Sequence, residues 1–169
     1  MIPVLTPLDN DPVHITVRPP TRDDAADMWR LAETSVDSNS PYSYLMLVEY
    51  LAGTCAVAVD DDGALAGFVT GFRVPDDPST LFIWQIAVSP DRRGLGIGAQ
   101  LLDGLAGRLA APRLRYLEAS VTPGNDASAA LFRSFAESRR TECVEEELFD
   151  AADFPGEHDP EVRYRIGPF

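Results

Sequence analysis

The segment that decides the fold is TLFIWQIAVSPDRRGLGIG, residues Thr80–Gly98. Its first half, residues 81–88, is a short apolar run rich in aromatic and branched side chains, which predicts a buried strand. Pro90 ends this strand, because proline has no N–H to donate. The leucines that follow have helical spacing and predict a helix; they are Leu101, Leu102, Leu105 and Leu109. A glycine-rich turn between strand and helix is typical of an anion site, because the first helical N–H groups lack partners and glycine lets a phosphate approach.

Three other kinds of glycine-rich turn can be compared with this pattern. A P-loop requires GxxxxGK[ST], and the chain contains no lysine. A dinucleotide-binding turn fits better, because Gly94, Gly96 and Ala99 match GxGxxA and Glu118 lies where a ribose-binding acid would follow. However, a Ser-Pro-Asp turn and two arginines separate the strand from the glycines, and no second βαβ half follows. The third alternative is a tight turn that binds nothing.

The composition predicts one globular domain. The chain has 169 residues, of which 45% are hydrophobic. We expect residues 1–13 to form a flexible lead-in and residues 14–169 to form a single domain. No apolar run approaches the roughly 20 residues of a membrane span, and a charged secretion signal is missing, so we expect a soluble cytoplasmic protein. The net charge of −13 argues against nucleic acid as a partner.

The remaining pattern predicts an α/β fold. Strands are expected at residues 14–18, 55–59, 65–72, 114–121, 142–149 and 162–166, and helices at residues 21–35, from Leu45 onward and after Asn125. This order predicts one mixed, strongly twisted sheet with helices on both faces. Residues 36–44 are expected to form a polar loop between the first two helices. Cys55 and Cys143 are expected to be reduced, and no Cys/His cluster has metal-ligand spacing, so no metal is predicted.

The motif Arg93-x-x-Gly96-x-Gly98, after a strand that ends in Val-Ser-Pro, resembles the acetyl-CoA-binding motif of the GNAT acetyltransferase superfamily. The resemblance implies a GNAT-like single domain. In that family the loop amides hold the pyrophosphate of acetyl-CoA, and the central strand splays to accept the pantetheine arm. The cofactor-binding residues that it implies are Ile86, Ala87, Val88, Arg93, Gly94, Leu95, Gly96, Ile97, Gly98, Asn125 and Phe132.

Further segments are similar to the L-2,4-diaminobutyrate acetyltransferases within this superfamily, which acetylate the γ-amine on the way to the compatible solute ectoine. The most specific are Asp37–Tyr44, with its Asp-x-Asn-Ser start, and the strand that contains Trp84 and Gln85. The similarity covers about residues 15–168. It implies acetyl-CoA as co-substrate, a small diamino acid as substrate and a homodimer. One position departs from the family pattern, because Ala119 stands where threonine is expected.

The resemblance and the chemistry together suggest roles for individual residues. Glu118 is the predicted general base, directly or through water, unless it is solvated or paired with an arginine. Asn125 is expected to hold pantetheine or a water, and a helix N-cap is its alternative role. Asp37 is expected to pair with a substrate ammonium, and the backbone near Ile86 is expected to supply the oxyanion donor. The predicted substrate-binding residues are Asp37, Asn39, Tyr42, Tyr44, Trp84, Gln85, Glu118, Thr122 and His158. Trp84 has an alternative role as plain core.

Two questions stay open in the sequence. Phe132 stands where the superfamily often has a tyrosine that protonates the leaving thiolate, and the available phenols are those of Tyr42, Tyr44 and Tyr116. Residues 150–161 form a polar excursion that we expect to meet a partner subunit or to line the acceptor pocket, with His158 and Glu161 as candidates. The alternative functions are acetylation of another small amine or a protein N-terminus, and a non-catalytic acyl-CoA-binding module.

Overall fold

The computed structural model describes residues 14–110 and 113–169, so the predicted lead-in at residues 1–13 lies outside the described residues. The described chain forms one seven-stranded sheet in the order β1-β2-β3-β4-β5-β7-β6. The strands are β1 Thr16–Arg18, β2 Ala56–Val59, β3 Leu65–Val74, β4 Asp77–Val88, β5 Tyr116–Val121, β6 Cys143–Phe149 and β7 Glu161–Ile166. This confirms the mixed α/β sheet predicted from the sequence.

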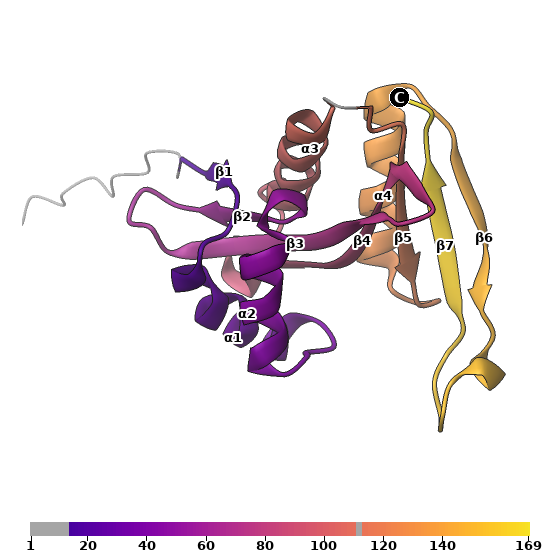
Figure 1. The fold of residues 1–169 in the computed structure, drawn as a ribbon, viewed down its shortest axis with the longest axis horizontal. Helices are drawn as coiled ribbons and strands as arrows, with labels where there is room; N and C mark the ends of the chain where they lie inside the picture. The colour runs from indigo at the N-terminus through magenta and orange to yellow at the C-terminus, as the bar shows by residue number, and fades with distance from the viewer. Residues whose placement is uncertain (1–13, 111–112) are drawn as a thin grey trace, which may run out of the picture.

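Helices cover both faces of the sheet (Figure 1). They are α1 Ala25–Ser35, α2 Pro41–Tyr50, α3 Ile97–Leu109 and α4 Asp126–Arg139. The apolar sides of α3 and α4 pack on one face in a core that includes Leu101, Phe132 and Leu117. On the opposite face, α1 and α2 enclose a second core that includes Met28, Tyr44 and Phe68. The predicted leucine spacing of α3 is confirmed, because Leu101, Leu102 and Leu105 are buried and Leu109 is partly buried against the same core.

The one parallel pair of the sheet lies at its centre. β4 pairs with β3 in antiparallel fashion and with β5 in parallel, and α3 makes the crossover between β4 and β5. The parallel pairing runs only from Thr80↔Tyr116 to Ile83↔Ala119, although both strands continue further. Beyond Ile83, therefore, the edge of β4 that faces β5 has backbone groups without a partner strand, and these groups are available to a ligand.

A β-bulge sits where the two strands part. Thr70 of β3 pairs with Gln85 and Gly71 pairs with Ile83, so Trp84 is an extra residue in β4. An extra residue reverses the faces of the residues that follow it. Ile83 accordingly packs in the core under α3 and α4, whereas Ala87 packs in the core under α1 and α2. The bulge brings Gln85 to the α1–α2 side of the sheet.

The loop between the first two helices is shorter than predicted. The expectation of a polar loop through residue 44 is wrong, because α2 already begins at Pro41. Proline is favoured at the first helical position, where its missing N–H has no partner to lose, and the serine before it is a preferred N-cap residue. The loop is therefore limited to residues 36–40, and Tyr42 and Tyr44 belong to a helix.

The last two strands form a long hairpin at one edge of the sheet, and its tip projects beyond the helices (Figure 1). This tip contains the predicted excursion, with a short 3-10 helix at Ala151–Asp153. Among residues 14–110 and 113–169, no helix is long and apolar enough to cross a bilayer.

Candidate active site

Two cavities adjoin at the point where β4 and β5 separate. One has a volume of about 670 Å³ and lies between the end of α1, β4, β5 and the start of α4. The other has a volume of about 650 Å³ and lies between β4, the glycine-rich loop and α4. They share five lining residues, which are Ser35, Val36, Ile86, Asn125 and Ser128. A ligand in one cavity can therefore reach a ligand in the other.

The glycine-rich loop forms the wall of the second cavity. Gly94 and Gly96 have φ angles of 77° and 73°, in the left-handed region that favours glycine, and Gly96 is the residue just before α3. A Cβ at either position would meet no atom within 4 Å, so the loop presents open backbone. Gly98 has another role. A Cβ there would lie 3.2 Å from Leu131 Cδ2, so this glycine lets α3 approach α4.

These features fit acetyl-CoA. Free N–H groups at the start of a 13-residue helix, beside glycines that leave room, form an anion site suited to a pyrophosphate. The same cavity runs from this loop along Ile86, Ala87 and Val88, where the edge of β4 facing β5 lacks a partner strand. Most of the predicted cofactor residues line it. Leu95 does not, because its side chain points to solvent, and Phe132 lines the first cavity instead.

The first cavity is acidic. Its wall includes the carboxylates of Glu33, Asp37 and Glu161, and no described residue that lines it is basic. Glu161 Oε1 accepts a hydrogen bond of 2.8 Å from the hydroxyl of Thr122. Trp84 is 47% exposed and lines this cavity, so it is not plain core. Such a wall suits a small ligand that carries positive charge.

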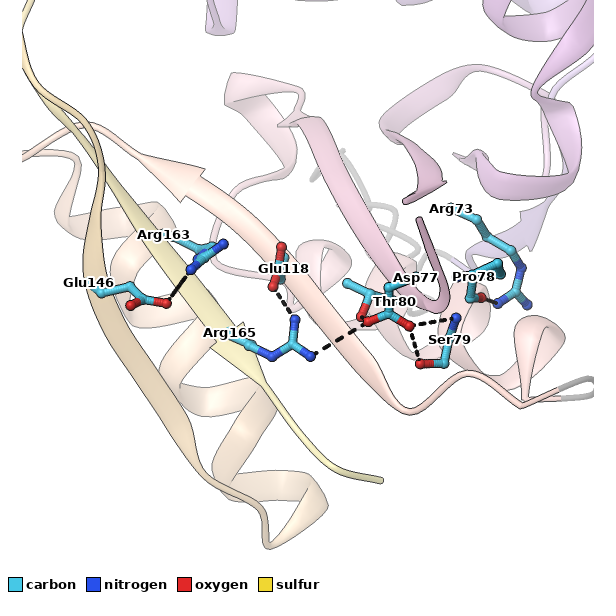
Figure 2. Close-up of polar contacts among 9 residues, drawn as sticks. All are labelled: Arg73, Asp77, Pro78, Ser79, Thr80, Glu118, Glu146, Arg163 and Arg165. Carbon is cyan, nitrogen blue, oxygen red and sulfur yellow. Dashed lines mark hydrogen bonds and ion pairs between the residues drawn. The ribbon is translucent and has the colours of Figure 1, made fainter. Parts of the chain in front are cut away.

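The predicted base, Glu118, lies elsewhere. Its carboxylate accepts a hydrogen bond from Arg165 of β7 (Figure 2). Glu118 does not line either cavity. Figure 2 shows the guanidinium between Glu118 and Asp77. The guanidinium also stacks on the ring of Tyr116, 3.9 Å from the ring centre. Burial lowers the pKa of Arg165, but these carboxylates outweigh it and the pKa is raised. The geometry favours the arginine-paired alternative, and the role of Glu118 as base stays a prediction.

Three other predicted substrate residues lie away from the cavities. Tyr42 is 67% exposed on α2, and Tyr44 of the same helix is fully buried. The ring of His158 stacks on Phe154 at 3.9 Å in the hairpin tip. Neither these tyrosines nor Tyr116 line the two cavities, so the three phenols are poorly placed to protonate a thiolate. Of the two candidates in the excursion, Glu161 lines the first cavity and His158 lines neither.

The other predicted residues meet at the junction or in the first cavity. Asn125 lines both cavities and also caps α4, because its Oδ1 accepts from the backbone N–H of Ser128 at 3.2 Å. Both roles considered for Asn125 are thus compatible. Asn39, Gln85 and Thr122 line the first cavity, as does Ala119, whose methyl group replaces the expected hydroxyl.

Sequence reasoning missed the hydroxyls of Ser35 and Ser128, which line both cavities. Ser128 could have been found, because it stands three residues after the N-cap Asn125 and therefore in the first turn of α4. Ser35 ends α1 and carried no comparable signal.

In the part of the chain that the structure describes, no group of three or more His, Cys, Asp or Glu side chains is placed to hold a metal ion.

The sequence matches a known family and named relatives within it. The family model for the acetyltransferase (GNAT) family matches residues 21–136. An L-2,4-diaminobutyric acid acetyltransferase from Streptomyces coelicolor is 50% identical over 155 residues, which cover 89% of this chain and 91% of the relative. One from Shouchella clausii is 47% identical over 156 residues, covering 91% and 87%.

A solved structure is also similar. It is the diaminobutyrate acetyltransferase EctA from Paenibacillus lautus in complex with its substrate L-2,4-diaminobutyric acid and coenzyme A. The TM-score is 0.86 at 36% sequence identity, and the match covers 92% of this chain and 96% of that chain. The chain belongs to the GNAT acetyltransferase family and, within it, to the L-2,4-diaminobutyrate acetyltransferases.

Proposed function

We propose that this protein transfers the acetyl group of acetyl-CoA to the γ-amine of L-2,4-diaminobutyrate, as a step toward ectoine. The observation that carries the proposal is the junction of an acidic acceptor cavity with a phosphate-binding cavity at the separated ends of β4 and β5. Two relatives at 47% and 50% identity, both named L-2,4-diaminobutyric acid acetyltransferase, support the choice of acceptor.

Different residues stabilise the charge that develops in the reaction and position the two substrates. When bound, acetyl-CoA supplies the acetyl group as an activated thioester. The backbone of β4 beyond Ile83 offers N–H donors that can stabilise negative charge on the acetyl oxygen. Asn125 and the end of α1 hold the two substrates next to each other, which lowers the entropic part of the barrier.

The attacking amine must lose a proton. Glu161 already faces the acceptor cavity and is held by Thr122, whereas Glu118 would first have to release Arg165. We therefore propose Glu161 as the group that receives the proton, directly or through water, in place of the predicted Glu118. Water or a cavity hydroxyl such as that of Ser128 then protonates the leaving thiolate.

Regiochemistry follows from the position of the two amines. An α-amine titrates near pH 8 and a γ-amine near about 10, so in water the α-amine is the more available nucleophile. Acetylation of the γ-amine requires the protein to reverse this order by placement. Asp37, at the α1 end of the cavity, is proposed to hold the α-ammonium in its charged form, while backbone and hydroxyl donors take the substrate carboxylate.

Replacing Asp37 with alanine is expected to raise the KM for L-2,4-diaminobutyrate about 10- to 30-fold and to leave the KM for acetyl-CoA unchanged. The expected size corresponds to the loss of one hydrogen bond to a charged group, about 1.5–2 kcal/mol. Steady-state kinetics with each substrate varied in turn measures both constants. Asp62→Ala, an exposed aspartate in the β2–β3 turn, makes the same charge change as a control. An acetyl-CoA KM that rises equally would remove Asp37 from the acceptor site.

Thiol release from acetyl-CoA tests the proposed acceptor against its alternatives. L-2,4-diaminobutyrate, ornithine, lysine and a peptide are offered side by side. The proposal expects the fastest release with L-2,4-diaminobutyrate. Faster thiol release with another amine or with the peptide would identify that compound as the acceptor instead. No thiol release with any of the four would favour an acyl-CoA-binding module.

We also propose a cytoplasmic homodimer. One helix supports it, because α2 exposes the apolar side chains of Tyr42, Leu45, Met46 and Tyr50 along one side. A contiguous exposed apolar surface often marks a protein interface. An intracellular place suits acetyl-CoA as the co-substrate. Light scattering at micromolar concentration is expected to give twice the 18.4 kDa chain mass, and a monomer would contradict the proposal.

A further inference from the structure

A chain of two hydrogen bonds connects the buried core to the acceptor cavity. The hydroxyl of Tyr44 donates to Gln85 Oε1 at 3.1 Å, and Gln85 Nε2 donates to the backbone carbonyl of Asp37 at 2.7 Å. The three residues lie on α2, on β4 just after its bulge, and in the loop that follows α1. Two segments singled out in the sequence, the Asp-x-Asn-Ser loop and the Trp-Gln strand, are therefore joined by one bond.

The order of donors fixes the orientation of the amide. A primary amide can present either its oxygen or its nitrogen to a neighbour. Because the Asp37 carbonyl can only accept, Gln85 must turn its nitrogen toward Asp37, and its oxygen then faces Tyr44, which donates. The tyrosine is held in turn. It is 0% exposed, and its ring meets Phe68 edge to face at 6.1 Å.

The Asp37 loop depends on this bond. Within residues 14–110 and 113–169, no other side chain is hydrogen-bonded to the backbone of residues 36–39. The adjoining helix ends supply the local bonds, such as that from Val36 N to Ala32 O at 3.0 Å. The Asp37 side chain itself is exposed and lines the cavity. Its backbone anchor therefore sets where the carboxylate stands.

We propose that Tyr44 is a positioning residue for the acceptor: through Gln85 it fixes the backbone of Asp37 and so places the carboxylate that binds the substrate ammonium. This rests on the proposed function of Asp37. It replaces the predicted role of Tyr44 as a substrate-binding residue, because the phenol is buried away from both cavities. It also accounts for a tyrosine hydroxyl in an otherwise apolar core, where phenylalanine would pack equally well.

Tyr44→Phe tests the proposal, because it removes only the hydroxyl. The KM for L-2,4-diaminobutyrate is expected to rise about three- to tenfold, the range for one lost neutral hydrogen bond. The KM for acetyl-CoA and kcat are expected to change by less than about twofold. Tyr116→Phe, which also removes only a hydroxyl and lies outside both cavities, is the matched control and is expected to behave as the unmodified protein. A purely structural role for Tyr44 would move both KM values together or lower only the melting temperature.

A double-mutant cycle tests whether Tyr44 acts through Gln85. In a Gln85→Leu background, Tyr44→Phe is expected to have no further effect on the amine KM, because the hydrogen bond from Gln85 to Asp37 is already lost. Independent, additive effects would overturn the proposal. An unchanged amine KM in Tyr44→Phe would also overturn it, and Asp37→Ala separates the causes. If Asp37→Ala raises the amine KM, only the role of the Tyr44–Gln85 hydrogen bonds is wrong. If Asp37→Ala leaves the amine KM unchanged, the proposed role of Asp37 is itself wrong.

Discussion

Gly96→Val is expected to lower kcat/KM for acetyl-CoA about 100-fold and to abolish measurable binding of the co-substrate in calorimetry at ordinary concentrations. Gly96 has a φ of 73°, and a β-branched side chain resists that conformation. Forcing it costs on the order of 1–3 kcal/mol, and relieving the strain moves the N–H groups that start α3. A side chain would also fill the open space in front of the loop, where a phosphate must approach.

A control separates this effect from general damage to the helix. Gly107 also lies in α3, and a Cβ there would meet nothing within 4 Å, but its φ is not in the left-handed region. Gly107→Val is therefore expected to bind acetyl-CoA as the unmodified protein does. Undiminished binding by Gly96→Val would remove the loop from the co-substrate site, whatever the acceptor.

Glu118→Gln is expected to lower the free energy of unfolding by about 2 kcal/mol while kcat stays within about threefold. Glu118 is 7% exposed, and the loss of its charge leaves the more distant Asp77, 3.7 Å away, as the remaining carboxylate partner of Arg165 among the described residues. Breaking a fully buried pair costs about 3–5 kcal/mol, and we expect less here because Arg165 is partly solvated. In a chain of this size the melting temperature should fall by about 4–8 °C.

The neighbouring pair provides the control. Glu146 and Arg163 form an ion pair on the same face of the sheet (Figure 2), but the side chain of Glu146 is 47% exposed, whereas that of Glu118 is 9% exposed. Glu146→Gln removes an equal charge and is expected to change the stability by less than about 1 kcal/mol. If Glu118→Gln instead keeps its melting temperature and loses at least 100-fold in kcat, Glu118 is the general base and Glu161 is not.

The local order of the fold could be predicted because its signals are local. The apolar strand, the proline and the leucine spacing around the glycine-rich loop specify β4, the turn and α3 within 30 residues. The start of α2 was missed, although Pro41 after Ser40 is a recognised helix start, because the polar sequence of residues 36–44 suggested one continuous loop. The bulge at Trp84 had no local signal, since it depends on the register against β3.

The site was harder to predict where its contacts join distant residues. The sequence predicted that Glu118 lies near the substrate. Its side chain instead turns toward Arg165, 47 residues later, which donates a hydrogen bond to it. Likewise, the polar sequence around Tyr44 predicted a residue in a loop. Only the tertiary structure shows that Tyr44 is buried and hydrogen-bonded to Gln85, 41 residues later. Asn125 and the glycine-rich loop could be assigned correctly to cavity walls, because a helix N-terminus acts through its own backbone and cap.

The most direct test of the whole account is the structure of the product. The protein is incubated with acetyl-CoA and L-2,4-diaminobutyrate, and the acetylated amine is assigned by NMR while thiol release is counted. We predict one γ-acetyl-diaminobutyrate per thiol released, with no α-acetyl product. An α-acetylated product would contradict the placement of the α-ammonium at Asp37, and the absence of any acetylated diaminobutyrate would contradict the proposed activity itself.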